Sequence, residues 1–191
     1  GDFEISRSLR FNSADSAYLN RTPSSAGNRK TWTWSGWVKR SEDNGVSQSL
    51  WSIRNSSPNQ QLFRIESSNI LRIYLEVGSS VKYDLSTDQV FRDFGAWYHI
   101  VLAFDSTQST ASDRVKLYVN GAQVTSFSSA TYPSQNQDGV INTSGARHDI
   151  GQGGNNNDYL GAYLAEVNFI DGSALDPTSF GAFDANGVWQ A

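Results

Sequence analysis

Three linked segments in the second half of the chain restrict its fold more than any other feature of the sequence. Residues 97–105 form one long apolar run, and residues 159–169 form another. Between them lie two short alternating runs, 114–119 and 122–124, with two residues separating them. Runs of this length, rich in β-branched and aromatic residues and bounded by turn residues, are typical of strands. The second half is therefore expected to consist largely of antiparallel strands.

The two residues between the short runs are Asn120 and Gly121. A two-residue hairpin turn of type I′ needs positive φ at both central positions, and Asn-Gly adopts it with little strain. Such a turn fixes the register of its two strands, and register decides which side chains face the core. Residues 114–124 are therefore predicted to form a β-hairpin.

Period-two patterning extends the strand prediction to the first half. In residues 31–39, Trp32 and Trp34 fall on one face and Trp37 on the other. Trp32 and Trp34 are therefore expected in the core, whereas Trp37 faces either a groove or a covering loop. Further short runs follow at residues 8–11, 17–19, 49–53, 62–66, 70–77 and 81–85. This spacing predicts an all-β fold, a jelly-roll sandwich of two antiparallel sheets, with residues 1–191 as a single domain.

Helix is expected at one short segment. Asp176 would cap a single turn that begins at Pro177, because proline suits the first helical position. Residues 128–145 are expected to form a long polar loop. The sequence has no initiator Met and no signal peptide, so we expect it to be part of a longer or processed protein.

Composition and charge argue against several classes of partner. The net charge is −4 and the fifteen basic residues are scattered, whereas nucleic-acid binding depends on clustered Lys and Arg. No apolar run approaches the length that crosses a bilayer, so membrane insertion is not expected. Nucleic acid and membrane are therefore not expected as partners.

Catalytic patterns are missing from the sequence. Retaining glycosidases need two carboxylates about 5 Å apart, and sandwich enzymes supply them from alternating positions of one strand. Glu166 and Asp171 are five residues apart, with Glu166 inside a predicted strand and Asp171 beyond it. His99 and His148 have no supporting motif, and each is better explained as a packed strand residue. The domain is therefore not expected to be an enzyme.

The order of these motifs resembles that of laminin-G, pentraxin and other concanavalin-A-like jelly rolls. The N-terminal half narrows the resemblance to laminin-G-like (concanavalin-A-like) lectin domains of marine and cyanobacterial bacteriophage tail-fibre and structural proteins. The segments that carry it are residues 8–12, 16–19, 21–23, 28–33, 35–40, 97–101, 114–121 and 169–172. This resemblance implies a non-catalytic module on a virion surface or outside the cell that binds a glycan of the host cell envelope. A decoration domain that contacts only other virion subunits and a glycan-cleaving enzyme remain as alternatives.

Two polar loops resemble, in order and spacing, the ligand loops of pentraxins, which bind calcium through carboxylates and amides. The resemblance implies a ligand-binding rim built from Trp51, Asn59, Gln60, Asn155, Asn157, Asp158 and Tyr159. Amides and carboxylates beside aromatic rings also suit sugars, because hydroxyls hydrogen-bond and C–H faces stack on rings.

Calcium is an alternative ligand for the same loops, and Asn155 and Asp158 are its candidate binding residues. Calcium sites use several oxygen ligands, and Asp158 is the single carboxylate in the two loops, so any calcium would bind weakly. A plain turn is the alternative, because consecutive Asn residues after Gly tolerate left-handed backbone conformations.

Overall fold

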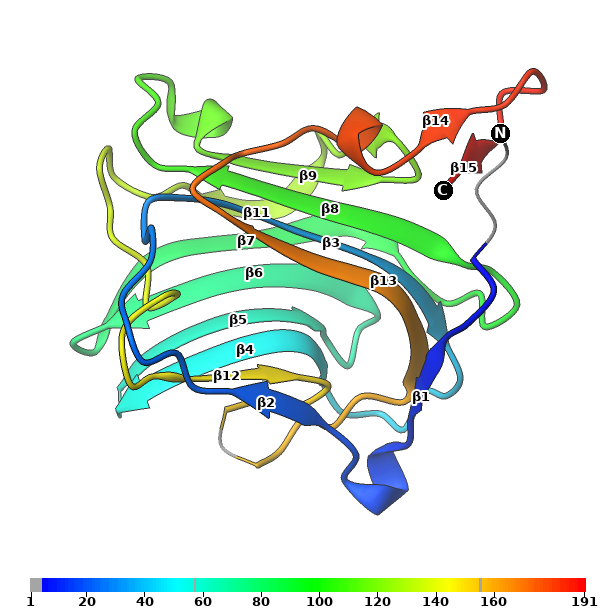
Figure 1. The fold of residues 1–191 in the computed structure, drawn as a ribbon, viewed down its shortest axis with the longest axis horizontal. Coiled ribbons are helices and arrows are strands. Elements are labelled where there is room, and N and C mark those ends of the chain that lie inside the picture. Colours follow the sequence, from blue (N-terminus) through cyan, green and yellow to red (C-terminus); the bar gives the residue numbers. More distant parts are fainter. Residues whose placement is uncertain (1–4, 57, 155) are drawn as a thin grey trace.

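Alternating burial along each strand separates an inner set of side chains from an outer set. In β6 (Ile70–Val77), Leu71, Ile73 and Leu75 are buried, and the residues between them are partly exposed. Strands with this pattern have one apolar face, and two such sheets bury those faces against each other. The computed structural model, which describes residues 5–56, 58–154 and 156–191, forms this kind of sandwich (Figure 1).

Both sheets are antiparallel and contain strands from distant parts of the chain. The six-stranded sheet has the order β1 (Leu9–Phe11), β13 (Ala162–Asp171), β3 (Thr31–Arg40), β8 (Tyr98–Asp105), β9 (Val115–Val119) and β10 (Ala122–Gln123). The seven-stranded sheet has the order β11 (Phe127–Thr131), β7 (Ser80–Val90), β6, β5 (Asn59–Ile65), β4 (Gln48–Ser56), β12 (Arg147–Ile150) and β2 (Leu19–Arg21). The part of the chain that the structure describes also contains three single-turn 3₁₀ helices, η1 (Ser13–Asp15), η2 (Ala111–Asp113) and η3 (Pro177–Ser179). The predicted all-β sandwich is confirmed.

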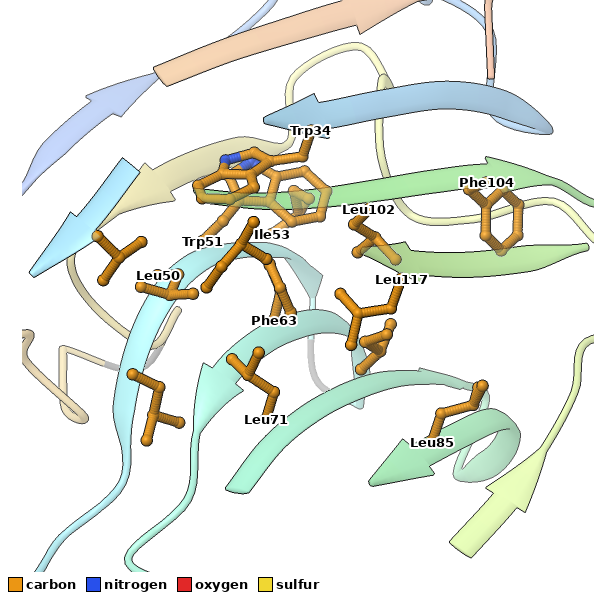
Figure 2. Close-up of a cluster of buried hydrophobic side chains, with 14 of the residues drawn as sticks. Trp34, Leu50, Trp51, Ile53, Phe63, Leu71, Leu85, Leu102, Phe104 and Leu117 are labelled. Carbon is orange, nitrogen blue, oxygen red and sulfur yellow. The ribbon is translucent and has the colours of Figure 1, made fainter. Parts of the chain in front are cut away.

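The core fills the space between the two sheets. Figure 2 shows Trp34, Leu102 and Leu117 from the six-stranded sheet meeting Phe63 and Leu71 from the seven-stranded sheet. Each of these five side chains is completely buried. Packing of large rings and branched aliphatic side chains between the sheets supplies most of the driving force for folding.

Local predictions for the hairpin and the two tryptophans are confirmed. Asn120 and Gly121 have φ values of 48° and 78°, and they join β9 to β10. Asn120 also accepts a hydrogen bond from the backbone N–H of His99 through its Oδ1, at 2.8 Å. Trp32 and Trp34 are both completely buried. The turn thus has the backbone conformation that its two residues predict.

The predicted helical turn is also present, whereas the predicted loop is only partly a loop. Asp176 caps η3, because its carboxylate accepts a hydrogen bond from the Thr178 N–H at 2.9 Å. Within residues 128–145, the first four belong to edge strand β11, and Val140 and Ile141 are buried. The side-chain oxygen of Gln61 accepts hydrogen bonds from both of their N–H groups at 3.0 Å, so this segment closes one end of the core.

The C-terminal segment packs on the outside of the six-stranded sheet (Figure 1). It carries β14 (Ala182–Phe183) and β15 (Trp189–Gln190), which pair with each other. Trp189 is 7% exposed because its ring stacks on His99 at 5.8 Å between ring centroids. Among the described residues, no helix is long and apolar enough to cross a membrane.

Candidate functional site

A polar cleft lies on the outer face of the seven-stranded sheet. Because the inward positions of β5 and β6 are filled by core residues, Arg64, Arg72 and Tyr74 point outward. Arg64 lies directly across from Arg72 in the β5–β6 pair, and Leu62 lies across from Tyr74. The cavity has a volume of about 290 Å³. Its lining residues are Gln60, Leu62, Arg64, Arg72, Tyr74, Gly153, Gly154, Asn157 and Asp158.

Carboxylates hold the two arginines in place. Arg64 forms ion pairs with Glu66 and Asp158, each at 2.9 Å. Arg72 forms ion pairs with Asp84 at 2.6 Å and with the same Glu66 at 3.3 Å. Two facing guanidinium groups would otherwise repel each other, so Glu66 between them stabilises the arrangement. The floor of the cleft is therefore a connected and ordered network of charges.

The pKa values in this network follow from the same contacts. Burial disfavours the charged form of Glu66, but the hydrogen bond from Ser47 and the charges of Arg64 and Arg72 outweigh burial and lower its pKa. The hydrogen bond to Asp84 raises the pKa of Arg72. Glu66 and Arg72 are therefore both ionised at neutral pH.

The wall of the cleft is the loop after β12, which folds back over the outer face of β4. The Ser52 hydroxyl donates to the Gln152 carbonyl at 2.8 Å, and the Ser49 N–H donates to the Asp158 carbonyl at 2.8 Å. A Cβ atom at Gly154 would lie 2.7 Å from the Cβ of Arg54, so glycine permits this close approach. The loop thereby carries the Asp158 carboxylate to Arg64, and burial raises the pKa of Asp158.

Three of the seven sequence-predicted residues line this cleft, namely Gln60, Asn157 and Asp158. Asn59 is engaged in a turn, because its Oδ1 accepts a hydrogen bond from the Gly78 N–H at 2.9 Å. Sequence reasoning did not select the two arginines or Tyr74. Their alternation with buried residues along two adjacent strands is the signal that identifies them.

Tyr159 points away from the cleft. Its ring packs against that of Tyr18, with the centroids 6.4 Å apart, and it does not line the cavity. Asn155 lies outside the described residues. Among the described residues of the two loops, the side chains that line the cleft are those of Gln60, Asn157 and Asp158, beside Gly153 and Gly154.

Trp51 does not form part of an exposed rim, in contrast to the prediction from the sequence. It is 4% exposed and lies in the core, because its position in β4 faces inward. Its ring borders a separate cavity of about 350 Å³ at the open edge between the sheets, beside Phe169 and His148. Both ring nitrogens of His148 form hydrogen bonds within the domain. The lining of this cavity is more apolar than that of the cleft, with Leu19, Ile150 and Phe169 beside Trp51.

The cleft does not fit calcium well as it is arranged. Asp158 is the carboxylate expected to bind the ion, but its Oδ2 is 2.9 Å from the Arg64 guanidinium. A calcium ion would have to displace that cation, and calcium sites use several oxygen ligands. Among the described residues, no group of three or more His, Cys, Asp and Glu side chains could hold a metal.

The position of Trp37 is resolved by the structure. It lies on the outer face of the six-stranded sheet, partly buried, with its ring 4.9 Å from that of His99. His99 is 1% exposed, and its ring also contacts the covering Trp189. Trp37 therefore lines a groove whose wall is the C-terminal segment.

Comparison with known proteins identifies the family. Residues 12–179 match the family described as the concanavalin A-like lectin/glucanases superfamily, Laminin_G_3, so the chain belongs to this family. No curated protein sequence matches the chain significantly.

Several solved structures share the fold at low sequence identity. Domain 4 of AbnA, a GH43 extracellular arabinanase from Geobacillus stearothermophilus, has a TM-score of 0.65 and 16% identity over 93% of this chain and 76% of that one. CBM40 of the Ruminococcus gnavus IT-sialidase has a TM-score of 0.54 and 14% identity over 84% and 95% of the two chains. The SAP-like pentraxin of Limulus polyphemus has a TM-score of 0.53 and 16% identity over 88% and 73%. These likenesses concern the fold.

Proposed function

We propose that this domain is a non-catalytic module that binds a neutral glycan in the polar cleft. The observation that carries the proposal is the ordered network of Arg64, Arg72 and their carboxylates beside Tyr74. Sugar hydroxyls both donate and accept hydrogen bonds, so they suit a surface that offers guanidinium groups and carboxylates side by side. Because these side chains are already ordered by one another, binding immobilises few additional groups.

The relatives support a glycan as the ligand. The arabinanase domain is in complex with arabinotriose, and CBM40 has a structure bound to α2,6-sialyllactose. Both share the sandwich with this chain.

Charge favours a neutral glycan over an acidic one. The network contains two guanidinium groups and three carboxylates (Glu66, Asp84 and Asp158), so its net charge is −1. Each arginine is already paired, and an anionic sugar would have to displace a carboxylate from it. A neutral sugar can hydrogen-bond to the network without breaking its ion pairs.

The setting that we propose is a bacteriophage tail fibre or other virion protein that attaches to the host cell envelope. The order of motifs across the sequence supports this setting. Other virion subunits are further proposed partners, and the domain would act on the virion surface or outside the cell.

A glycan array with the isolated domain tests the proposal. The domain should bind at least one neutral glycan, and Asp158→Asn should weaken that binding about tenfold, because one charged hydrogen-bonding group is lost. Asparagine has the same shape and tolerates the φ of 50° at this position. The melting temperature should change little, because a partly exposed ion pair contributes about 1 kcal/mol or less.

Tyr159→Ala is the matched control, because Tyr159 is adjacent in sequence but lies outside the cleft. It should bind like the parent. Absence of binding to any glycan or host-envelope fraction would favour a decoration domain with protein partners alone. Release of reducing ends from a bound polysaccharide would instead identify an enzyme.

A further inference from the structure

A second concave site lies on the opposite side of the sandwich, on the outer face of the six-stranded sheet. This cavity has a volume of about 360 Å³. Its floor comes from β3, β8 and β13, and its wall comes from η3 and the C-terminal segment (Figure 1). The residues around it include Ser35, Trp37, His99, Glu166, Asn168 and Phe180.

The aromatic floor of this cavity is rigid. Trp37 packs on His99 at 4.9 Å between ring centroids. The His99 ring is fixed in turn, because its Nδ1 accepts from the Trp189 Nε1–H at 2.9 Å and its Nε2 lies 3.0 Å from the Ser35 hydroxyl. Trp37 is therefore a partly exposed indole on a fixed support, an arrangement suited to stacking against the C–H face of a sugar ring.

Glu166 is turned into the cavity by an irregularity in β13. The register between β13 and β3 shifts between Ala165 and Asn168, so an extra residue lies opposite β3. At this bulge Glu166 has a φ of 46°, a left-handed conformation that glycine adopts more easily than any other residue. The neighbouring Val167 still packs against the core, so the bulge keeps the inner face apolar and exposes Glu166 on the outer face.

Polar groups beside the indole are free to bind a ligand. Among the described residues, the Glu166 carboxylate has no hydrogen-bond or ion-pair partner. The Asn168 side chain donates to the Glu166 carbonyl at 2.8 Å, and its own oxygen has no donor among those residues. A free carboxylate and a free amide oxygen next to an indole match the hydroxyls and the apolar face of a pyranose.

We propose that this cavity is a second sugar-binding site, which takes a single neutral pyranose ring on Trp37 with hydroxyls held by Glu166 and Asn168. A neutral sugar is favoured, because an unpaired carboxylate repels an acidic one. The two sites lie on opposite faces of the sandwich, so one domain could contact two glycan chains. When two binding sites are linked in one domain, the overall affinity for a surface carrying several glycans rises, although neither site gains a contact.

The test follows the indole N–H signals of ¹⁵N-labelled protein by NMR, since the six tryptophans give six resolvable probes. The probes are the methyl glycosides of glucose, galactose, mannose and N-acetylglucosamine. At least one glycoside should shift the Trp37 signal along a saturable curve and leave the Trp51 signal in place.

Glu166→Gly is the decisive variant. It should weaken this binding about tenfold, because it removes the carboxylate. It should also leave the melting temperature unchanged or raise it, because glycine relieves the positive φ at this position. Loss of binding without loss of stability would distinguish a ligand-binding role for Glu166 from a structural one.

Three results would overturn the inference. They are no shift of the Trp37 signal with any glycoside, an equal shift in Glu166→Gly, and a shift with tetramethylammonium alone, which would identify a cation site. Asp158→Asn should leave the Trp37 response unchanged, so failure of this site and failure of the polar cleft are separate outcomes.

Discussion

Gly121→Val is expected to destabilise the domain by about 3 kcal/mol or more. Two independent effects contribute to this loss. Gly121 has a φ of 78°, which a β-branched residue adopts with strain. A Cβ atom at this position would also lie 2.2 Å from the Trp189 ring, so the C-terminal segment would have to move. Urea unfolding followed by tryptophan fluorescence measures the change.

Gly145→Val separates the two effects. Gly145 has the same φ of 78°, but a Cβ atom added there would meet nothing within 4 Å. This variant should therefore lose only the strain energy, about 1–2 kcal/mol. Equal losses in the two variants would show that contact between Trp189 and the turn contributes little to stability.

Acid is expected to destabilise the domain through His99, beginning as the pH falls below about 6.5. Burial lowers the pKa of His99 to about 4, compared with about 6.5 for a free histidine. A histidine whose pKa is lower in the folded state than in the unfolded state makes its full contribution to the free energy of unfolding above pH ~6.5. This contribution is lost as the pH falls towards ~4. The loss should approach about 3 kcal/mol, since each pKa unit corresponds to about 1.4 kcal/mol.

The hydrogen bonds of His99 show which part should open first. Protonation of Nδ1 removes the acceptor for the Trp189 indole N–H, so the C-terminal segment should detach before the sandwich unfolds. Urea unfolding between about pH 7 and pH 5 checks the slope, with His99→Gln as the comparison. Burial also lowers the pKa of His148. The free energy of unfolding of His99→Gln should therefore still fall with pH, but less steeply than that of the parent. An unchanged slope in His99→Gln would show that His99 does not cause the loss of stability in acid.

The architecture of this protein was predictable where local chemistry and tertiary packing agree. Asn120 and Gly121 specify their turn through backbone conformation alone, and Trp32 and Trp34 alternate with polar residues as a half-buried strand requires. Residues 140 and 141 were harder to predict, because two isolated apolar residues in a polar loop show no periodicity. The Gln61 side chain from a distant strand determines where they pack.

The candidate site was only partly predictable, because it depends on strand pairing. Gln60 and Asp158 are distant in sequence, and the loop after β12 brings them together by folding over β4. Trp51 precedes the same polar stretch, but strand alternation turns it into the core. The facing of Arg64 and Arg72 follows from the register of β5 and β6, which the sequence alone did not specify.

The outer face of the six-stranded sheet shows a further limit of sequence reasoning. Its cavity needs a C-terminal segment that returns to cover His99, and a bulge that turns Glu166 outward. Neither feature has a local signal, because glutamate is an unusual residue at positive φ and the covering contact spans 90 positions.

The polar cleft is the proposed binding site for a neutral glycan. The most direct test is backbone amide NMR of the domain, titrated with the neutral glycan that binds best on the array. We predict that the amides of β5, β6, Gly153, Gly154, Asn157 and Asp158 shift together along one saturable curve, because these residues form the floor and wall of the cleft. Shifts confined to the opposite sheet or to the edge between the sheets, with these amides unchanged, would show that the glycan binds elsewhere.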